Sequence, residues 1–444
     1  MIAHARAVAF QILMQVEKGA HSDELLRTRS VNALTTQDRA LATTLILGTL
    51  RWQMKLDARL RPLLSRPDAA LASPIETALR LGAYQLLYLD RIPAYAAVGE
   101  SVELAKQAGE THAARMVNAI LRKVAKLPSE SESAKPESAA QIADAFAHPA
   151  WMVERWESFY VLETAAAICR FDQQPAAVYV RLLDPDAEAA LSADGVQLQP
   201  GEFLTSARRV VSGDIVRSRP FLEGRIRIQD EASQLVAELA GAGNRILDTC
   251  AAPGGKAAIL AERNPHAAIT AWDISKRRLE AMRRMFPSSE RMQFEMRDAT
   301  TAKLQPEYDL ILCDVPCTGT GTIGRNPEIR FRVNQEDIAR HHARQVKMLS
   351  SALAGLAREG RLLYSTCSLE PEENEAVIAE SLEANPGFIV RPLDDELETL
   401  CAKGIITGAG AERLKASALK NGFLRTIPGI HDCDGFFAAL LTRN

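Results

Sequence analysis

Residues 248–256, which read Asp-Thr-Cys-Ala-Ala-Pro-Gly-Gly-Lys, constrain the fold more than any other part of the chain. An apolar run ending at Leu247 precedes them and another begins at Ala257, which is the pattern of a strand, a tight turn and a helix. Gly254 and Gly255 permit positive φ angles and let a ligand approach the backbone closely. The free N–H groups at the start of the helix would point towards that ligand.

Two common nucleotide-binding motifs do not fit this stretch. A phosphate-binding P-loop has Gly where Cys250 stands and Ser or Thr where Ala257 stands. The Gly-x-Gly-x-x-Gly pattern of dinucleotide-binding folds is also missing. A glycine pair between a strand and a helix is by itself more typical of an ordinary turn, so its interpretation depends on the rest of the chain.

From Ile228 onward, predicted strands and helices alternate. This alternation predicts a Rossmann-like α/β domain, with a mostly parallel sheet covered by helices on both faces. In such sheets ligands bind at the carboxyl ends of the strands. We expect strands at 246–250, 268–272, 293–296, 308–313 and 361–364, an edge strand at 436–441, and helices at 229–240, 276–286, 334–357 and 372–384.

Three acidic residues, Asp273, Asp298 and Asp314, follow successive predicted strands. Each one alone is more typical of a helix cap or a turn. Together, beside the glycine turn, they indicate a nucleoside-shaped site, with Asp273 placed to bind a ribose diol and Asp298 a base amino group. Because the pyrophosphate fingerprint is missing, we expect a nucleoside without phosphates, and S-adenosylmethionine is the obvious candidate.

The first 126 residues have apolar residues at helical spacing throughout and predict an all-helical domain. Lys and Arg outnumber Asp and Glu there, although the whole chain has a net charge of −3, which favours an anionic partner for this domain. An ordinary solvated helical bundle would show the same excess. Residues 127–147 are rich in Ser, Glu and Pro and predict a linker. Residues 148–228 predict a small α+β, RRM-like subdomain, with strands at 177–183, 209–211, 214–216 and 225–228, and residues 229–444 form the α/β domain.

Seven cysteines are present, and their spacing matches no zinc motif. A lone cysteine is more often a small buried apolar residue than a nucleophile. Cys317 and Cys367 differ from the others because each follows a predicted strand and would face the nucleoside pocket. A zinc site made by these two is disfavoured since no His accompanies them, so we expect covalent catalysis and no metal. We interpret the remaining thiols as buried apolar groups: Cys169, Cys250, Cys313, Cys401 and Cys433.

Over nearly its whole length the chain resembles the bacterial RNA cytosine-C5 methyltransferases of the NOL1/NOP2/Sun family. Its first 126 residues resemble the RNA-binding helical domain of the antitermination factor NusB, as in the Sun/Fmu-type enzymes of small-subunit ribosomal RNA. Two departures are Gly324, where the family usually has a basic residue, and Val315, where it often has Ala. The matching motifs are residues 248–256, Asp-Val-Pro-Cys-Thr-Gly-Thr-Gly at 314–321, Ser-Thr-Cys-Ser at 365–368, Gln-Asp-Glu-Ala-Ser at 229–233, Arg-Asn-Pro-Glu-Ile at 325–329 and Asp-Gly-Phe-Phe at 434–437.

The resemblance implies a mechanism and a set of site residues. Cys367 would attack carbon 6 of cytosine, Asp314 would hold or protonate ring nitrogen 3, and Cys317 would assist release. Lys256 would lower the pKa of a nearby thiol or orient Asp314. The implied contacts to S-adenosylmethionine are Cys250, Ala251, Ala252, Pro253, Gly254, Gly255, Lys256, Asp273, Asp298 and Asp314.

Several alternatives stay open at this point. In DNA methyltransferases a Pro-Cys cysteine is itself the nucleophile, so chemistry alone would allow Cys317 and Cys367 to exchange roles. A transfer-RNA methyltransferase of the same fold, or a non-catalytic RNA-binding assembly factor, would share much of the pattern. The NusB-like segment argues against the first, and the intact cysteines with Asp314 argue against the second. We therefore expect a monomeric enzyme of the cytoplasm that acts on 16S ribosomal RNA and does not enter a membrane.

Overall fold

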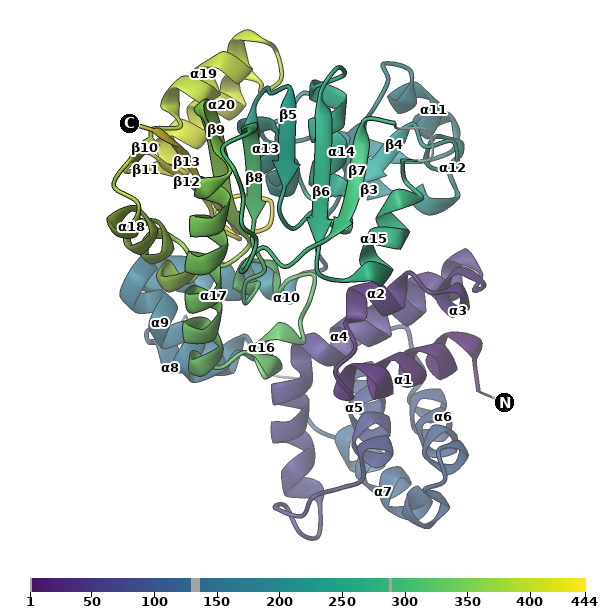
Figure 1. Ribbon diagram of the computed structural model, residues 1–444. Coiled ribbons are helices and arrows are strands. Elements are labelled where there is room, and N and C mark those ends of the chain that lie inside the picture. Colours follow the sequence, from purple (N-terminus) through teal and green to yellow (C-terminus); the bar gives the residue numbers. More distant parts are fainter. Residues whose placement is uncertain (1, 129–135, 287–289) are drawn as a thin grey trace. The chain divides into compact units, whose positions relative to one another are not determined.

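The computed structural model describes residues 2–128, 136–286 and 290–444, and these form two compact units (Figure 1). The first unit comprises Met1–Pro175 and Ile323–Arg332, and the second comprises Ala176–Thr322 and Val333–Asn444. Residues 129–135 of the predicted linker lie outside the described part of the chain. Among the described residues, the helices are all too short or too polar to span a membrane.

The first unit is built from helices, as the apolar spacing predicts. Helix α5 is buried on all sides from Thr77 to Gln85, whereas α1 buries one stripe that includes Ala9, Leu13 and Val16. Thr35 caps the longest helix by accepting a hydrogen bond from the N–H of Asp38. The main helices are α1 (His4–Glu17), α4 (Thr36–Leu60), α5 (Ser73–Tyr88), α6 (Ala94–Gln107) and α7 (Ala114–Val124), with short α2 (Ser22–Leu26) and α3 (Arg29–Asn32) after α1.

The predicted linker at 127–147 contains a helix that sequence patterning did not reveal. Ser138 caps α8 (Ala139–Ala145) by accepting from the N–H of Gln141, and Ile142 is fully buried. Helices α9 (Ala150–Tyr160) and α10 (Leu162–Gln173) follow and belong to the first unit. The predicted subdomain at 148–228 therefore falls in both units: its first two helices belong to the first unit and its strands to the second.

The segment Ile323–Arg332 leaves the second unit and is buried in the first. Glu328 accepts hydrogen bonds from the N–H and the hydroxyl of Ser22, at 2.7 and 2.8 Å. The buried guanidinium of Arg330 donates to the carbonyls of Arg51 and Ala147 at 3.1 and 3.0 Å. These bonds join the segment, which includes α16 (Ile329–Arg332), to α2, to α4 and to the turn at Ala147.

The second unit begins with a small antiparallel sheet in the order β2-β3-β1-β4. The predicted strand at 214–216 is instead a 3₁₀ turn, Ile215–Arg217, since Gly213 (φ 105°) reverses the chain just before it. The edge strand β2 was not predicted, because Gln-Leu-Gln-Pro has no alternation of apolar residues. Its elements are β1 (Val178–Leu182), α11 (Ala187–Ala193), β2 (Gln197–Pro200), β3 (Ala207–Ser212), α12 (Arg219–Leu222) and β4 (Ile226–Ile228).

One face of the small sheet is fixed to the large α/β body by charged groups. Arg181 is fully buried on this face and donates to Glu238 at 2.8 Å and to Glu262 at 2.6 Å. Arg209 pairs with Asp432 at 2.9 Å. The helices α11 and α12 belong to the opposite face, where Val180, Leu191 and Ile226 share a core. The arginine-bearing face is therefore occupied by contacts within this unit.

The large sheet has the order β11-β12-β13-β9-β8-β5-β6-β7, and β10 also pairs with β13. The five strands from β9 to β7 are parallel, as predicted. The prediction of an edge strand at 436–441 was wrong: β13 lies inside the sheet, antiparallel to β9 and β12, and its first six residues are buried. The strands are β5 (Arg245–Asp248), β6 (Ala268–Asp273), β7 (Met292–Met296), β8 (Tyr308–Asp314), β9 (Leu356–Thr366), β10 (Phe388–Arg391), β11 (Leu419–Lys420), β12 (Phe423–Thr426) and β13 (Phe436–Arg443).

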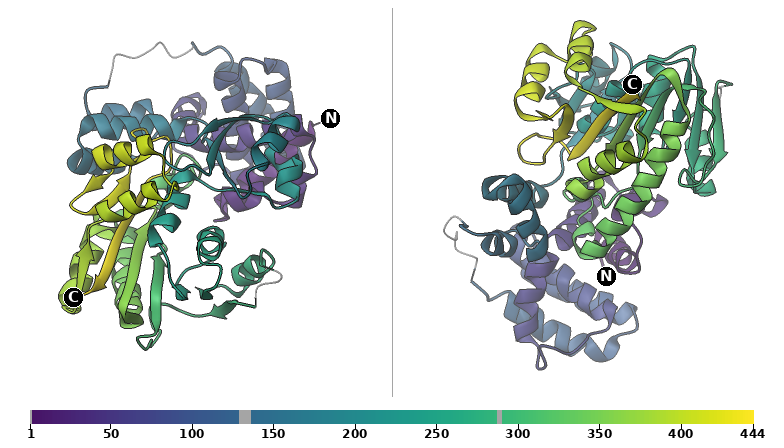
Figure 2. Two further views of the ribbon diagram at one scale, coloured as in Figure 1. Left: turned by 90° about the horizontal axis from the view of Figure 1, so that it is seen from above. Right: turned by 60° about the vertical axis from the view of Figure 1, so that its left-hand side comes forward.

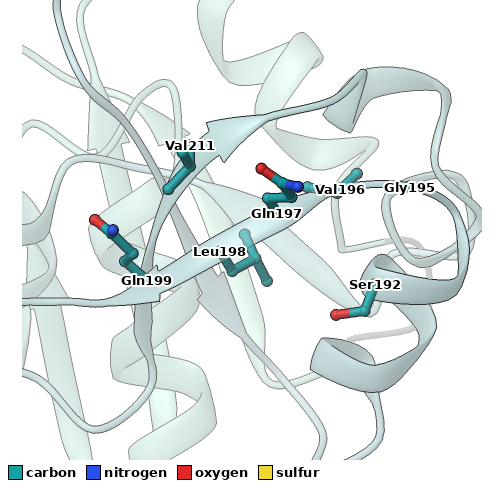
Figure 3. Close-up of a pocket in the computed structure, with 7 residues that line it drawn as sticks. All are labelled: Ser192, Gly195, Val196, Gln197, Leu198, Gln199 and Val211. Atoms are coloured by element: carbon teal, nitrogen blue, oxygen red, sulfur yellow. The ribbon is translucent and has the colours of Figure 1, made fainter.

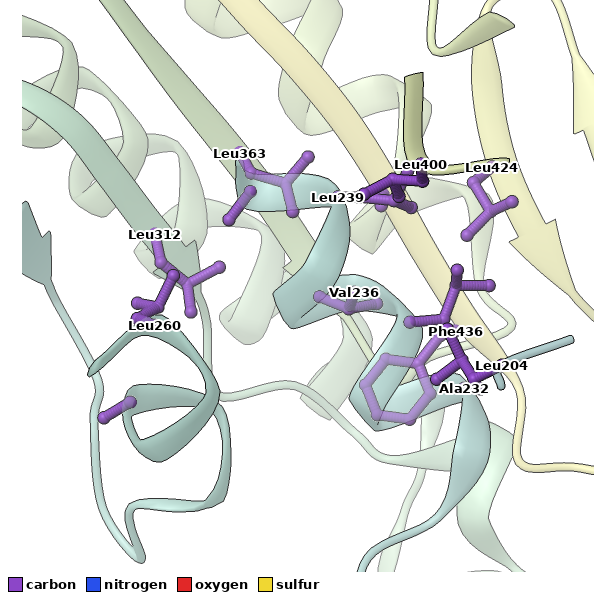
Figure 4. Close-up of a cluster of buried hydrophobic side chains, with 14 of the residues drawn as sticks. Leu204, Ala232, Val236, Leu239, Leu260, Leu312, Leu363, Leu400, Leu424 and Phe436 are labelled. Atoms are coloured by element: carbon purple, nitrogen blue, oxygen red, sulfur yellow. The ribbon is translucent and has the colours of Figure 1, made fainter. Parts of the chain in front are cut away.

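Helices cover both faces of the large sheet, and neighbouring strand residues alternate between two cores (Figure 1 and Figure 2). Ile246 and Leu312 belong to one core (Figure 4), whereas Leu247 and Ile311 belong to the other. This double burial explains why the strands read as continuous apolar runs. The first core takes α13 (Glu231–Ala240), α14 (Gly255–Arg263), α15 (Lys276–Arg283), α19 (Asp394–Ala402) and α20 (Gly408–Ser417), and the second takes α17 (Gln335–Ala354) and α18 (Glu375–Ala384).

Candidate active site

The carboxyl ends of the parallel strands gather the predicted site residues in the second unit. Asp273 is the last residue of β6 and Asp314 the last of β8, while Asp298 lies two residues beyond β7. Cys367 directly follows β9, which pairs in parallel with β8. The strand register therefore brings together groups that are far apart in sequence, as the alternation of strands and helices predicted.

The glycine turn joins β5 to α14 and has the shape expected from its sequence. Gly254 has φ +108°, and a Cβ there would lie 2.9 Å from Cγ of Met282, so only glycine fits without a shift. The N–H of Ala251 donates to the carbonyl of Trp272 at 2.7 Å, which ties the turn to β6. The Ala252–Pro253 peptide bond is cis.

A cavity of about 180 Å³ opens beside this turn. From the predicted site it is lined by Cys250 and Ala252 together with Asp273, Asp298 and Asp314, whereas Ala251, Pro253, Gly254, Gly255 and Lys256 are not among its lining residues. Sequence reasoning did not find the rest of the lining: Thr249, Ile274, Arg278, Arg297, Ala299, Val315, Pro316, Arg344 and Met348. A larger hollow of about 550 Å³ lies on the small sheet and includes no predicted site residue (Figure 3).

Asp273 and Asp298 are turn residues as well as cavity residues. Asp273 accepts a hydrogen bond from the N–H of Ser275 at 2.7 Å, and its other oxygen lies 3.5 Å from a guanidinium nitrogen of Arg278. Asp298 accepts from the hydroxyl of Thr300 at 2.7 Å and from its N–H at 2.9 Å, and these bonds lower the pKa of Asp298. The hydrogen bonds of these two turns fix each carboxylate at the cavity wall.

Asp248 is a buried carboxyl group that the site prediction omitted. Burial, followed by the charge of Asp314, raises its pKa to about 7. One oxygen accepts a 3.3 Å bond from the N–H of Cys250, and the other has no hydrogen-bond partner among the described residues. Its place as the first residue of the predicted motif was the only signal in the sequence.

Lys256 and Asp314 form an ion pair at 2.7 Å, with side chains 13% and 24% exposed. The hydroxyl of Ser365 donates to the other oxygen of Asp314, also at 2.7 Å. Burial lowers the pKa of Lys256, but the charge of Asp314 and the hydrogen bond between them outweigh burial and raise it above its ordinary value. The interaction of Lys256 with Cys367 acts in the same direction. Asp314 is thus held in one orientation, with a cation near Cys367.

The sulfur atoms of Cys317 and Cys367 lie 3.3 Å apart, and both cysteines are free thiols. Their loops are joined by a 2.9 Å bond from the N–H of Gly321 to the carbonyl of Cys367. A Cβ at Gly321 would lie 2.4 Å from the carbonyl oxygen of Gly435, so this close approach of two backbones requires glycine. The predicted pair of thiols is therefore present beside Pro316 and Asp314, which line the cavity.

The parallel sheet with its cavity at the strand ends, the ring of carboxylates and the adjoining thiols define a Rossmann-like methyltransferase. Comparisons with known proteins agree. A family model described as 16S rRNA methyltransferase RsmB/F matches residues 239–442, and a model of the NusB family matches residues 3–126.

Individual relatives resemble the chain over most of its length. The probable ribosomal RNA small subunit methyltransferase B of Bacillus subtilis is 30% identical over 97% of this chain and 97% of its own. Ribosomal RNA small subunit methyltransferase B of Xanthomonas campestris is 32% identical over 92% of this chain and 89% of its own. The crystal structure of PH0851, at 22% identity, has the same fold, with a TM-score of 0.81 and coverage of 100% of this chain and 99% of that one.

The chain belongs to the 16S rRNA methyltransferase RsmB/F family, which confirms the resemblance drawn from its motifs. S-adenosylmethionine is accordingly its cofactor, and the side chains that line the cavity suit this molecule. Asp273 and Asp298 offer acceptors for hydroxyl and amino groups, while Ile274, Ala299 and Met348 offer apolar surface for a flat base.

Proposed function

We propose that this protein transfers a methyl group from S-adenosylmethionine to carbon 5 of a cytosine in small-subunit (16S) ribosomal RNA, through a covalent bond to Cys367. The observation that carries the proposal is the thiol pair at 3.3 Å, beside the ion pair of Lys256 and Asp314. The names of the relatives supply the substrate class.

Carbon 5 of cytosine is too weakly nucleophilic to accept a methyl group directly. A thiolate that adds at carbon 6 turns carbon 5 into an enamine-like centre, which is the chemical reason for a cysteine nucleophile. The cofactor supplies an electrophilic methyl group on its sulfonium. Loss of the carbon 5 proton and departure of the cysteine then restore the ring. The target base has to leave its stack or lie in an open loop to enter such a site.

The charges around the thiols support Cys367 as the nucleophile. Lys256 interacts electrostatically with Cys367, so a cation stabilises negative charge on this sulfur during attack and departure. The pKa of Cys317 lies well above its ordinary value, because of its hydrogen bond to Cys367 and its burial. Cys317 therefore suits a role as the partner thiol that assists release.

Asp314 is placed to bind the edge of the cytosine ring that carries nitrogen 3. Lys256 and Ser365 hold its two oxygens, which fixes the carboxylate at the boundary between the cavity and the thiols. A carboxylate in this position stabilises the protonated ring that forms when the thiolate adds. Asp273 would bind the ribose hydroxyls of the cofactor, and Asp298 the amino group of its base.

We also propose a division of the chain into domains. Residues 1–126 bind RNA, and residues 127–147 link them to the rest of the chain. Residues 148–228 form the RRM-like subdomain, and residues 229–444 form the catalytic domain. The NusB family match and the basic excess of the first segment support this division. The two-unit division of the structure differs from it at α8–α10 and at Ile323–Arg332. All the proposed catalytic residues come from one unit of one chain, which supports a monomer, and a ribosomal RNA substrate supports a cytoplasmic enzyme.

Methyl transfer to defined RNAs tests this function. Purified protein with tritiated S-adenosylmethionine should label protein-free 16S RNA at one cytosine, which bisulfite sequencing locates, and the Cys367→Ala variant should not label it. Equal labelling of a transfer RNA pool and of 16S RNA would contradict the substrate assignment. Labelling at a nitrogen or at ribose would contradict the mechanism.

A further inference from the structure

Glu373 is a fully buried carboxylate that the mechanism above does not use. It lies in a 3₁₀ turn, Pro371–Glu373, after the loop of Cys367. Among the described residues it makes no ion pair, although burying an unpaired carboxylate is costly. Such a group is retained only where several hydrogen bonds satisfy it, so its donors indicate its purpose.

The donors to Glu373 come from the two cysteine loops. Thr318, which follows Cys317, donates its N–H to Oε1 at 2.9 Å and its hydroxyl to Oε2. Ser368, which follows Cys367, donates its hydroxyl to Oε2 at 2.5 Å. One carboxylate therefore bridges the residues that come directly after the two thiols.

The surrounding residues hold Glu373 itself in place. Gln345 of α17 donates to Oε1 at 3.0 Å and to the carbonyl of Pro316 at 3.0 Å. The hydroxyl of Tyr364 donates to the backbone carbonyl of Glu373 at 2.7 Å. Glu373 is thus held by residues of α17 and β9, which restricts its movement relative to the two cysteine loops.

The charge of Glu373 acts differently on the two thiols. The titratable groups that interact with Cys317 are Cys367, Glu373 and Tyr364. The pKa of Cys317 is raised by its hydrogen bond to Cys367, by burial, by the charge of Cys367 and by the charge of Glu373. Lys256 lies instead near Cys367. The cation Lys256 thus lies near Cys367, and the anion Glu373 lies near Cys317.

We propose that Glu373 is a positioning residue that locks the two cysteine loops together and holds a negative charge beside Cys317. The proposal rests on the proposed function. In the release step the carbon 5 proton passes to water, its electron pair closes the C5–C6 double bond, and the C6–S bond breaks with its pair moving to the sulfur of Cys367. The S–H group of Cys317 donates a hydrogen bond to that sulfur and stabilises the departing thiolate.

The matched variants are Glu373→Gln, which removes the charge at nearly constant shape, and Glu375→Gln, which removes the nearby carboxylate paired with Arg425. Thr318→Val is a third variant that removes one hydroxyl donor and keeps the charge. Calorimetry with S-adenosylmethionine checks that each variant is folded. The measurements are steady-state methylation of 16S RNA from pH 6 to pH 10 and the fraction of protein held as a denaturation-resistant RNA adduct.

Without the Glu373 charge, Cys317 ionises at lower pH and loses the proton that it donates. In Glu373→Gln we therefore expect the high-pH decline of turnover to begin about one pH unit lower than in the unmodified protein. The adduct fraction should rise about tenfold at the pH where turnover declines, because release is slowed there and attack is not. Glu375→Gln should match the unmodified protein, and Thr318→Val should lose turnover at every pH without moving the decline.

A pH profile of Glu373→Gln that is only scaled down, with no extra adduct, would overturn the proposal, as would a Thr318→Val variant that shifts the decline equally. If Glu373→Gln does not fold, Thr318→Val still tests the proposal. A high-pH decline of turnover that begins at lower pH in Thr318→Val than in the unmodified protein would contradict the role assigned to the Glu373 charge. RNA containing 5-fluorocytosine separates this proposal from the proposed function, because it traps any cysteine adduct at carbon 6. Failure of the unmodified protein to form that adduct would overturn the function itself.

Discussion

Lys256 donates a 2.7 Å hydrogen bond to Asp314, and the two residues come from the first turn of α14 and the end of β8. The pair joins the glycine turn to the loop of Cys317 and leaves Asp314 facing the cavity. Lys256 also lies 4.8 Å above the ring of Phe436, which places the ammonium between an anion and an aromatic face. Asp314 and Phe436 thus restrict the position of the Lys256 ammonium, and the ammonium in turn helps to fix the carboxylate of Asp314.

Replacing Lys256 by Met should separate catalysis from cofactor binding. The side chain does not line the cavity, so we expect the Kd for S-adenosylmethionine to change by no more than about threefold, whereas kcat falls about 100-fold. Loss of a charge-assisted hydrogen bond costs roughly 1.5–3 kcal/mol, and a 100-fold loss corresponds to about 2.7 kcal/mol, which lies within this range. Calorimetry and single-turnover methylation measure the two quantities. A variant with full activity, or with lost cofactor binding alone, would remove Lys256 from the catalytic group.

Asp273 should contribute to cofactor affinity through the ribose hydroxyls. Asp273→Ala removes acceptors from a buried position, so affinity for S-adenosylmethionine should fall about tenfold or more. Glu280→Ala is the matched control, because it removes an exposed carboxylate of α15 that does not line the cavity. Unchanged calorimetric affinity in a folded Asp273→Ala variant would place the ribose elsewhere.

Asp248 should make stability depend on pH. Its pKa is raised to about 7 by burial and by Asp314, so the folded state binds its proton more tightly than the unfolded state. Stability from this group is present at about pH 4 and is lost as pH rises towards 7, at up to roughly 1.4 kcal/mol per pH unit. Asp248→Asn should remove that dependence from urea unfolding curves, while replacing the exposed Asp68 by Asn should not. Parallel curves for the unmodified protein and Asp248→Asn would show that Asp248 titrates normally.

Arg330 should be a major source of stability in the helical unit. Its buried guanidinium donates hydrogen bonds to the carbonyls of Arg51 and Ala147. Burial lowers the pKa of Arg330 to about 10. Arg330→Met would remove the stronger of the two cations, Arg330 and Arg51, that act on the buried Asp172, whose pKa is raised to about 7 by its own burial, and should cost roughly 3–5 kcal/mol. The double variant Arg330→Met, Asp172→Asn should recover part of that loss in denaturant unfolding. Additive effects would show that the two groups are not coupled.

The sequence predicted the parallel sheet and the gathering of the site well, because strands buried on both faces produce continuous apolar runs whose ends are easy to recognise. It did not predict that β13 is internal, since this depends on β10 and β12, which are only four residues long. The burial of Ile323–Arg332 in the helical unit was also hidden, because the motif at 325–329 gave no sign that Glu328 or the adjoining Arg330 is buried.

Asp273 and Asp298 were found because they follow predicted strands, whereas Thr249, Val315 and Pro316 were missed although they lie in recognised motifs. Ser365 lies within a recognised motif, yet its bond to Asp314 depends on the register of β8 and β9. Glu373 lies in an acidic run, Glu-Pro-Glu-Glu-Asn-Glu, that is typical of solvated surface. Arg278 belongs to a helix predicted as basic, but no pattern indicated that its side chain reaches the cavity. Each of these roles arises from tertiary contacts rather than from local sequence.

The two cysteines should fail at different steps when each is replaced. Cys367→Ala cannot add to carbon 6, so it should show no methyl transfer and no covalent RNA complex, yet it should bind S-adenosylmethionine normally. Cys317→Ala should still attack and transfer the methyl group, and then remain as an adduct that survives denaturing gel electrophoresis. Loss of turnover alone decides nothing, since both variants should be inactive over many cycles.

The adduct is the discriminating observation, because it exists only if attack has succeeded and release has failed. Its methyl content, measured with labelled cofactor, should be one per trapped RNA in Cys317→Ala. The 3.3 Å separation of the sulfurs means that either thiol lies close enough to reach the same base, so geometry alone does not assign the roles. The charge of Lys256 beside Cys367 supports the proposed assignment. A trapped complex from Cys367→Ala and none from Cys317→Ala would reverse the assignment and make the Pro-Cys cysteine the nucleophile.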